Sequence, residues 1–407
     1  MKSRILLAQL VVSPCVSAFG ADHHVPRDFG TIQEAIDAAN LGDWVIVHPG
    51  HYPETIDLNG KAIVVTSTDP LDHAIVSSTV IDANGTGSVV TFASEEGPNT
   101  ILQGFRLTGG TGTAYDGDEG PGFGGGGIYC SGPVSPMIRS CIVSNNHVDG
   151  GWARGGGIYC HEGASPTVHG CLIRSNSVSG NPAAGGATTS WEGSPTFENV
   201  VMEDNWLIDT NLADLTYGGA MSSTYSEVTV RNSILRNNTA HVYRAGGVDC
   251  SFSSYLFENC ILEGNSGHGI VLDNESTALL RNCVITNSMS TGLTSVTGSF
   301  ATLLNTIVWN NGDVAIDVEY SSHVEATYSN IAGGWPGSGN FEADPVFTSL
   351  RRFDYLLDPD SPCVDSGDPS IDDALSDWHP RWPAYYPNGR RSDVGAYGGP
   401  GNWDWLD

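Results

Sequence analysis

The sequence predicts an all-β protein whose body is a right-handed parallel β-helix, a solenoid in which short strands stack rung on rung. The first observation behind this prediction is a repeated module that settles into a period of 23 residues. At ~3.3 Å per residue, such a period makes three short strands and three bends, which is one circuit of a parallel coil. The second observation is composition. Gly supplies 51 of the 407 residues and charged residues only 15%, which favours an ordered chain with many bends and few long helices.

The module is clearest in two copies that lie thirty residues apart. Residues 127–130 (Gly-Ile-Tyr-Cys) recur as residues 157–160, and residues 141–143 (Cys-Ile-Val) recur as residues 171–173 (Cys-Leu-Ile). Later copies of the first residue of that second segment are Val200, Ser233, Cys260, Cys283, Thr306 and Ser329, and the last three steps are 23 residues each. Longer modules are expected to carry inserted loops at one shared position, where they would rise on one side and wall a groove.

An asparagine column follows five residues after this landmark. Its members are Asn146, Asn176, Asn205, Asn238, Asn265 and Asn311, with Ser288 replacing the asparagine once. Asparagine suits a bend because it tolerates left-handed backbone, and stacked amides can bond to one another along the coil axis. We therefore interpret the column as structural.

Alternation along each strand predicts an outward aliphatic stripe. Cys141 and Val143 should face the interior, whereas the residue between them should face outward. The stripe comprises Ile142, Leu172, Val201, Ile234, Ile261, Val284 and Ile307. Such a stripe is rarely left in water, so we expect the C-terminal tail to cover it. The tail tryptophans that could lie on it are Trp378, Trp382, Trp403 and Trp405, and a partner subunit on the same face is the alternative.

Cysteines of neighbouring rungs are expected to stack inside the coil. The pairs are Cys130 with Cys160, Cys141 with Cys171, and Cys260 with Cys283. A rung spacing of ~4.8 Å lies within the Cα separation that a disulfide tolerates. Parallel side chains favour reduced or mixed stacks instead, because free cysteine packs as a small hydrophobe.

The two ends of the chain differ from its repetitive middle. Residues 1–20 form a predicted signal peptide, with Lys2 and Arg4 before an apolar stretch and a small-x-small cleavage site at 18–20. Residues 21–343 are the predicted β-helix with its N-terminal cap, a short amphipathic helix that Thr31 and Glu34 begin as a capping box. Strand-like residues 44–47, 62–66 and 89–92 follow this helix. Residues 344–407 form a predicted irregular C-terminal cap.

Charge and hydropathy restrict the partners of the chain. The formal net charge is −29, from 17 basic and 46 acidic residues, which makes nucleic acid and anionic membranes poor partners. No apolar run after the predicted signal peptide is long enough to span a bilayer. We expect a secreted, cell-surface or periplasmic protein of bacterial origin, and the sequence leaves its oligomeric state open.

Several segments resemble the pectin-lyase-like superfamily of parallel β-helices. Residues 30–36 and 50–54 (Gly-His-Tyr-Pro-Glu) look like the opening of pectin methylesterases, but the later catalytic motifs of that family have no counterpart here. Residues 344–347, 354–356, 361–365 and 393–397 resemble the closing segment of exported bacterial β-helix proteins. The resemblance implies the fold and leaves the chemistry open, because fold does not settle function.

Four residues are candidates for catalysis. Arg154 and Arg244 each precede a Gly-rich module start, and Asp249 follows on the outward column. A β-elimination lyase needs a base near the sugar, often Arg or Lys. His268 lies in a Gly-His-Gly that looks like the one in polygalacturonases, although their paired-carboxylate motifs are missing. The alternative is structural, with solvated ion pairs for the charged residues and an ordinary module position for the histidine.

Residues of the insertions are candidates for binding. The aromatic candidates for a carbohydrate site are Tyr115, Trp152, Trp206, Tyr217 and Tyr243, since rings stack on sugar faces. Asp116, Asp118 and Glu119 are candidate ligands for calcium, which prefers hard oxygen donors, but the rest of a twelve-residue calcium loop is missing. Solvated loop decoration is the alternative for both sets.

Three functions follow from these patterns. The first is an exported β-helix protein that binds polysaccharide along a loop-walled lateral groove. The second is a polysaccharide lyase or glycoside hydrolase that uses the same groove, and the third is a structural or adhesive surface protein.

Overall fold

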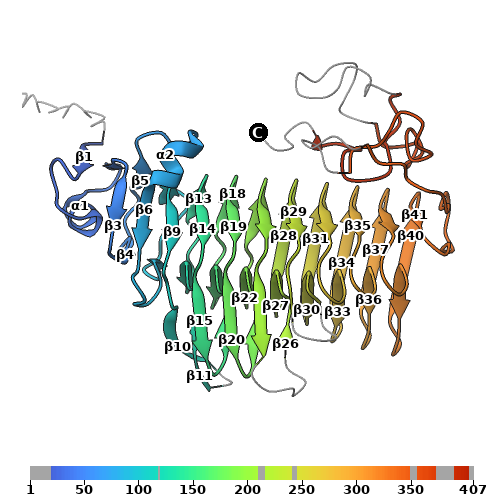
Figure 1. The fold of residues 1–407 in the computed structure, drawn as a ribbon, viewed down its shortest axis with the longest axis horizontal. Helices are drawn as coiled ribbons and strands as arrows, with labels where there is room; N and C mark the ends of the chain where they lie inside the picture. The colour runs from blue at the N-terminus through green and yellow to red at the C-terminus, as the bar shows by residue number, and fades with distance from the viewer. Residues whose placement is uncertain are drawn as a thin grey trace, which may run out of the picture.

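The computed structural model describes residues 20–117, 120–209, 216–240, 245–348, 355–372 and 389–402. These residues form the predicted parallel β-helix (Figure 1), in which three long sheets, here called A, B and C, run the length of the coil. Neighbouring strands in each of the three sheets pair in parallel. In sheet B, Val284 pairs with Ile307, which lies 23 residues further along the chain, so the period read from the sequence is one circuit.

The strand bounds show how regular the coil is. Sheet A contains β1 (Asp22–Val25), β2 (Trp44–Val47), β5 (Val64–Ser67), β8 (Ile101–Gln103), β13 (Met137–Arg139), β18 (Thr167–His169), β23 (Thr196–Glu198), β28 (Glu227–Arg231), β31 (Ser254–Glu258), β34 (Thr277–Arg281), β37 (Phe300–Leu304) and β40 (His323–Thr327). Sheet B contains β3 (Gly50–Tyr52), β6 (Thr79–Asp82), β9 (Arg106–Thr108), β14 (Ile142–Ser144), β19 (Leu172–Arg174), β24 (Val201–Glu203), β29 (Ile234–Arg236), β32 (Ile261–Glu263), β35 (Val284–Thr286), β38 (Ile307–Trp309) and β41 (Asn330–Ile331). Sheet C contains β4 (Ile56–Asp57), β7 (Val90–Phe92), β12 (Ile128–Ser131), β17 (Ile158–His161), β22 (Thr188–Trp191), β27 (Met221–Thr224), β30 (Val248–Ser251), β33 (Ile270–Asp273), β36 (Leu293–Ser295) and β39 (Ile316–Val318).

The N-terminal helix caps the coil as predicted. Helix α1 (Ile32–Ala38) begins with a complete capping box, in which Thr31 accepts from the backbone of Glu34 and the Glu34 carboxylate accepts from the backbone of Thr31. Ile32 and Ile36 are fully buried in the core of the coil. A second helix, α2 (His73–Ser78), precedes β6 and was not predicted. Neither helix of the described residues is long and apolar enough to cross a membrane.

Most of the insertion residues that the structure describes form strands, so the expectation of inserted loops was wrong for them. They form two small sheets beside sheet C (Figure 1). One contains β10 (Thr113–Gly117), β11 (Gly120–Gly124), β16 (Ala153–Arg154), β21 (Ala183–Ala184) and β26 (Thr216–Tyr217), and the other contains β15 (His147–Gly150), β20 (Ser177–Gly180) and β25 (Trp206–Asp209). We call these eight strands the extension. They enclose a small core of their own, made of Val148, Ala153, Val178, Ala183 and Leu207, which packs the two small sheets against each other.

The asparagine column is a buried ladder. Asn176 Nδ2 donates to Asn205 Oδ1 at 3.1 Å, and Asn205 Nδ2 donates to Asn238 Oδ1 at 2.9 Å. The same Asn205 amide also donates to the carbonyls of Ile173 and Glu203. Every amide in this part of the ladder therefore satisfies buried backbone groups as well as its neighbour, which confirms a structural role.

The cysteines stack between rungs as expected. Cys130 and Cys160 are register partners in sheet C, and the Cys141 backbone N–H donates to Cys171 Sγ at 3.4 Å. All eight cysteines of the described residues are buried free thiols. Burial, together with the hydrogen bond to Cys260, raises the pKa of Cys283 well above its usual range. The thiols consequently act as small apolar core residues.

The C-terminal tail covers one end of the outward stripe (Figure 1). Ile261, Val284 and Ile307 are fully buried beneath Leu356 and Val394. This confirms the predicted covering at that end. Nearer the other end, Val201 is partly buried against the same cluster, Leu172 is partly buried, and Ile142 is 5% exposed. The tryptophans Trp378, Trp382, Trp403 and Trp405, expected to lie on the stripe, fall outside the described residues.

Asparagines at the bend between sheets A and B hold the tail in place. Asn259 Nδ2 donates to the carbonyls of Ala396 at 2.9 Å and Gly398 at 2.7 Å. One rung further on, Asn282 Nδ2 donates to the carbonyl of Asp393 at 3.1 Å. These asparagines have φ values of 53° and 49°, a left-handed conformation that asparagine adopts more readily than most residues. The bend residues therefore both turn the chain and bind the tail.

We predict that Asn205→Ala lowers the free energy of unfolding by about 3 kcal/mol, because it leaves buried amide and carbonyl groups of two rungs without partners. Chemical denaturation monitored by circular dichroism measures the change. Asn99→Ala is the matched control, since Asn99 is exposed, and it should cost less than about 0.5 kcal/mol. Equal effects of the two substitutions would contradict the ladder.

We also predict that two truncations in the outward stripe differ in cost. Ile261→Ala should destabilise by about 2–4 kcal/mol, because it opens a cavity beneath the tail. Leu172→Ala, in the same column but only partly buried, should cost about 1 kcal/mol. The denaturation midpoints of both variants give the two losses of stability. If Leu172→Ala destabilises the protein as much as or more than Ile261→Ala, the tail does not protect the stripe.

Candidate functional site

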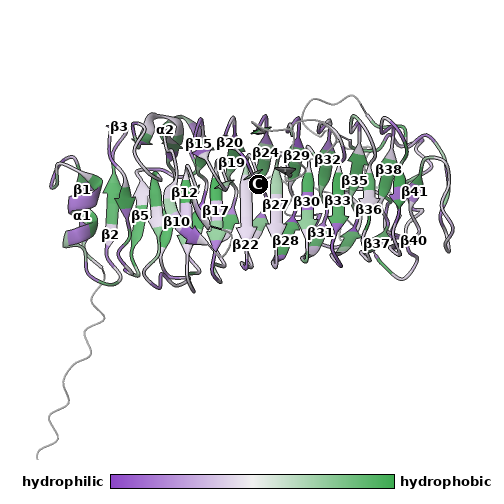
Figure 2. Cartoon of the chain, turned by 90° about the horizontal axis from the view of Figure 1, so that it is seen from below, coloured by the Kyte–Doolittle hydropathy of each residue, from purple (hydrophilic) through white to green (hydrophobic). Residues whose placement is uncertain are grey.

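The outer face of sheet C changes character where the extension stands beside it. The interior residues of β17 are Ile158 and Cys160, so Tyr159 and His161 point outward. Further along the coil, β22 (Thr-Thr-Ser-Trp) and β27 (Met-Ser-Ser-Thr) carry hydroxyl groups on this face. Figure 2 shows these two strands pale between more hydrophobic neighbours. A polar strip therefore begins beside a cluster of rings.

Arg154 is enclosed by aromatic rings at the seam between the extension and sheet C. It lies at the end of β16, and only 6% of its surface is exposed. Its guanidinium carbon lies 4.0 Å from the ring centroid of Trp191 and 5.2 Å from that of Trp152. The same carbon lies 5.8 Å from the Tyr115 ring, and Nη1 donates to the Tyr159 hydroxyl at 3.3 Å. We call Arg154 and these four rings the Arg154 cage.

The rings of the cage also support one another. Tyr115 and Tyr159 have centroids 5.1 Å apart, and His161 stacks on Tyr159 at 5.3 Å with an interplanar angle of 18°. The Tyr115 hydroxyl donates to the backbone carbonyl of Trp152 at 2.8 Å. Burial raises the pKa of Tyr159 far above its usual range, against the opposing effect of Arg154. The phenol therefore stays neutral, and the guanidinium is stabilised by ring faces.

The packing around Arg154 counts against the hypothesis that this arginine acts as a catalytic base. An arginine base must reach the sugar, but the guanidinium of Arg154 is covered by Trp191 and Trp152. The recess that remains beside the cage has a volume of ≈ 10 Å³ and is lined partly by Pro182, Thr189 and Ser222. That volume is small for a whole sugar chain, so the cage forms an end or a wall of a site.

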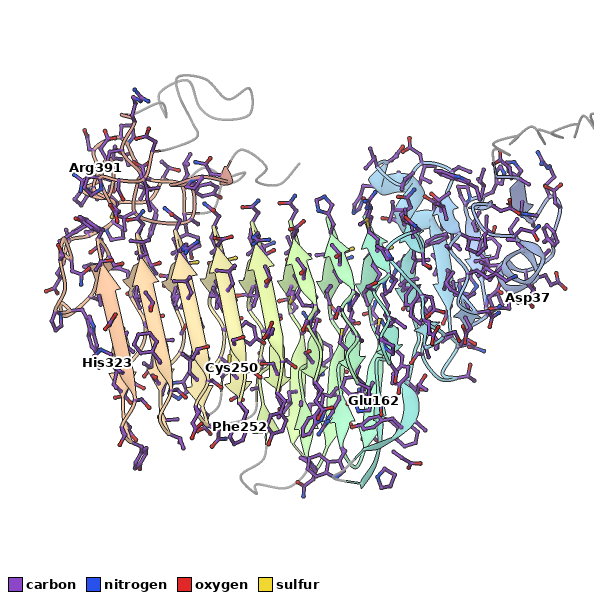
Figure 3. All side chains as sticks on the ribbon, turned by 180° about the vertical axis from the view of Figure 1, so that it is seen from behind. Asp37, Glu162, Cys250, Phe252, His323 and Arg391 are labelled. Carbon is purple, nitrogen blue, oxygen red and sulfur yellow. The ribbon has the colours of Figure 1, made fainter. Side chains whose placement is uncertain are left out.

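An exposed row of rings extends from the cage along the coil axis. Trp191 meets Tyr225 edge to face, with centroids 5.9 Å apart and planes at 79°. Tyr225 stacks on Phe252 with centroids 5.0 Å apart and planes at 14°. Tyr225 is 53% exposed and Phe252 is 45% exposed. We call these three residues the aromatic row, and Figure 3 labels its last member, Phe252.

The aromatic row stands at the bends between sheets C and A. Tyr225 and Phe252 have φ values of 52° and 48°, so each occupies the left-handed position of its bend. Large rings in this conformation are uncommon. The neighbouring rungs have Glu192 and Asn274 at the same bend. None of the three ring residues was among the sequence candidates for carbohydrate binding, because those candidates all lie in the insertions.

The other carbohydrate candidates are dispersed or lie outside the described residues. Tyr115 and Trp152 belong to the Arg154 cage, whereas Trp206 is 38% exposed at the start of β25. Tyr217 is described by its backbone alone, as the end of β26, and Tyr243 falls outside the described ranges. The predicted set is thus split, and only its first two members meet in one place.

The remaining catalytic candidates lie further along the coil. Asp249 is buried on β30, three rungs from Tyr159, which corresponds to ~14 Å at ~4.8 Å per rung. Burial raises the pKa of Cys250 well above its usual range, and the negative charge of Asp249 adds to this effect. The Nδ1 atom of His268 lies 3.0 Å from Thr294 Oγ1. Arg244 is outside the described residues, so its role as a catalytic candidate stays a hypothesis.

The calcium hypothesis also stays a prediction. Asp116 is exposed on β10, in an antiparallel hairpin with β11, while Asp118 and Glu119 fall outside the described residues. Among the residues that the structure does describe, no three His, Cys, Asp or Glu side chains are grouped to hold a metal ion.

Comparisons with known proteins place the fold. No curated protein matches the chain. Among solved structures, the chain is similar to one described as the crystal structure of pectate lyase Pel9A, with a TM-score of 0.53 and 13% sequence identity over 89% of each chain. At this identity the likeness shows the fold alone.

A family model described as the right handed beta helix region matches residues 103–254 and 246–338. These matches span more than half of the 407 residues and confirm the right-handed β-helix predicted from the repeats. The chain therefore belongs to the family of right-handed β-helix region proteins.

Proposed function

We propose that this protein binds a polysaccharide lengthwise along the aromatic row, with the Arg154 cage as one end of the site. The observation that carries the proposal is the stacked and exposed pair of Tyr225 and Phe252. Aromatic faces stack on the apolar faces of sugars. Leaving two large rings half-exposed forgoes part of their burial energy, which a ligand would recover.

Hydroxyl side chains flank the rings on the outer face of sheet C. Thr224 is the outward residue before Tyr225, and Ser251 is the outward residue before Phe252. Hydroxyl groups donate to and accept from sugar hydroxyls, which would fix a chain that the rings hold by stacking. Rings and hydroxyls repeat at the rung spacing, so the site is linear, as an extended polymer requires.

Export is part of the proposal, with residues 1–20 as the signal peptide and a secreted, cell-surface or periplasmic bacterial location. Residues 1–19 of this segment fall outside the described residues. The other two functions are outcomes of the test below. The burial of Arg154 counts against its use as a lyase base.

We predict that the double variant Tyr225→Ala/Phe252→Ala loses at least tenfold in glycan affinity, because it removes both half-exposed rings. Affinity electrophoresis through gels containing soluble polysaccharides gives the dissociation constants. Tyr320→Ala is the matched control, since Tyr320 is a 74% exposed ring at the same bend, three rungs past Phe252, and it should leave affinity unchanged.

The same gels separate the three functions. Retention that depends on Tyr225 supports binding. Release of shortened or unsaturated products would select the lyase or hydrolase instead. No retention in any glycan would overturn the proposal in favour of a structural or adhesive protein.

A further inference from the structure

We infer that the polymer bound by the aromatic row is a neutral glycan and not a polyuronate. This inference rests on the proposed function and adds the charge class of the ligand. It follows from the side chains that stand on either side of the row.

Acidic residues occupy the bends next to the row. Glu192 and Glu162 stand at the two bends that precede Tyr225, and their left-handed φ values of 55° and 53° match those of the row. Backbone hydrogen bonds place these bends one above another: Gly163 N–H donates to the carbonyl of Glu192, and Glu192 N–H donates to that of Thr224. At ~4.8 Å per rung, the two carboxylates lie one and two rungs from Tyr225.

These carboxylates are accessible to a ligand. The side chain of Glu162 is 57% exposed, and Glu192 is also exposed. Figure 3 labels Glu162 and Phe252 on this side of the coil. Past the row, Asp273 continues the outward column of Thr224 and Ser251, so a long ligand would meet acids at both ends of the rings.

Compensating cations are scarce here. Among the described residues of sheet C, its bends toward sheet A and the extension, the Arg and Lys residues are Arg154 and Lys61, and Lys61 lies at the N-terminal end of the coil, where it donates to the last carbonyls of α1. The guanidinium of Arg154 is held against Trp191 and Trp152, and the residue is 6% exposed, so it does not present a donor fork to a carboxylate in the groove. His161, the nearest imidazole on this face, is 5% exposed.

The balance of charge therefore opposes a polyanion. Each uronate carboxylate that binds one or two rungs from a glutamate lowers the affinity of the polymer about threefold in water at low salt. The net charge of −29 adds a long-range repulsion that salt screens. A neutral polymer avoids both penalties and keeps the ring stacking and hydroxyl contacts. A divalent cation bridging the glutamates to a uronate is the one arrangement that would reverse this order.

The test compares affinity electrophoresis in hydroxyethylcellulose, glucomannan, polygalacturonate and alginate, at low salt, with a chelator and then with added calcium. We expect at least one neutral polymer to bind tenfold or more tightly than either polyuronate in both conditions. Glu162→Gln/Glu192→Gln should raise polyuronate affinity by roughly tenfold at low salt and leave neutral binding unchanged. Glu319→Gln removes an exposed acid directly before the bend residue Tyr320, several rungs away, so it should change neither affinity.

Each outcome has a distinct meaning. Polyuronate binding equal to or tighter than neutral binding, with or without calcium, would overturn the inference and leave the proposed function standing. An equal response of the double glutamine variant and the Glu319 control would overturn the role of the two bend glutamates. If none of the four polymers retains either the unmodified protein or the Tyr225→Ala/Phe252→Ala variant, the proposed function is wrong and the inference is wrong with it.

Discussion

Parallel backbone pairing between rungs is the constraint on which the rest of this structure depends. Because each strand pairs with the strand one circuit later, the same position in successive modules falls at nearly the same place on the coil, ~4.8 Å apart. Any residue type that recurs at a position is therefore stacked on itself. Asparagine benefits, because one amide can donate to the next, as Asn176 does to Asn205. Buried cysteine and aliphatic columns benefit through close packing.

The same constraint penalises like charges, and the outer face of sheet A shows the remedy. Glu198, Arg231, Glu258 and Arg281 occupy one column and alternate in sign. Their side chains approach to 3.5, 2.7 and 3.1 Å in successive pairs. These groups are partly exposed, so each pair contributes little stability. Alternation matters more by avoiding the repulsion that a column of like charges would create. Against that pattern, Glu162 and Glu192 beside the aromatic row stand out, because they follow one another in one column with no arginine between them.

The repeat predicted the coil because it acts over many rungs at once. Four features could be predicted from the sequence, because each rests on spacing or on the burial of a column. They are the module period, the ladder that begins at Asn146, the capping box at Thr31 and the covering of Ile261 by the tail. The extension was missed as strands because pairs such as Ala183–Ala184 are too short to show alternation.

The candidate site was less predictable because it depends on residues brought together from different rungs. Tyr225 and Phe252 occupy bend positions whose neighbours are Glu192 and Asn274, so no recurring residue type marks that column. The burial of Arg154 could not be anticipated either. Arginine is usually solvated, and its enclosure arises only once Trp152 and Trp191 converge on it from separate insertions and strands.

The position of the site follows from where the rungs lengthen. A 23-residue rung closes on itself and leaves only sheet faces and bends outside. Consecutive longer rungs add the extension, which has its own core around Val148 and Val178 and stands beside sheet C as a wall. The seam between wall and sheet must be filled, and the Arg154 cage fills it with rings that pack around the guanidinium. Fixing the cage in the seam leaves Trp191 at its rim, where Tyr225 and Phe252 continue the rings into solvent. A packing requirement at the seam thus places a rigid aromatic edge where an extended ligand can reach it.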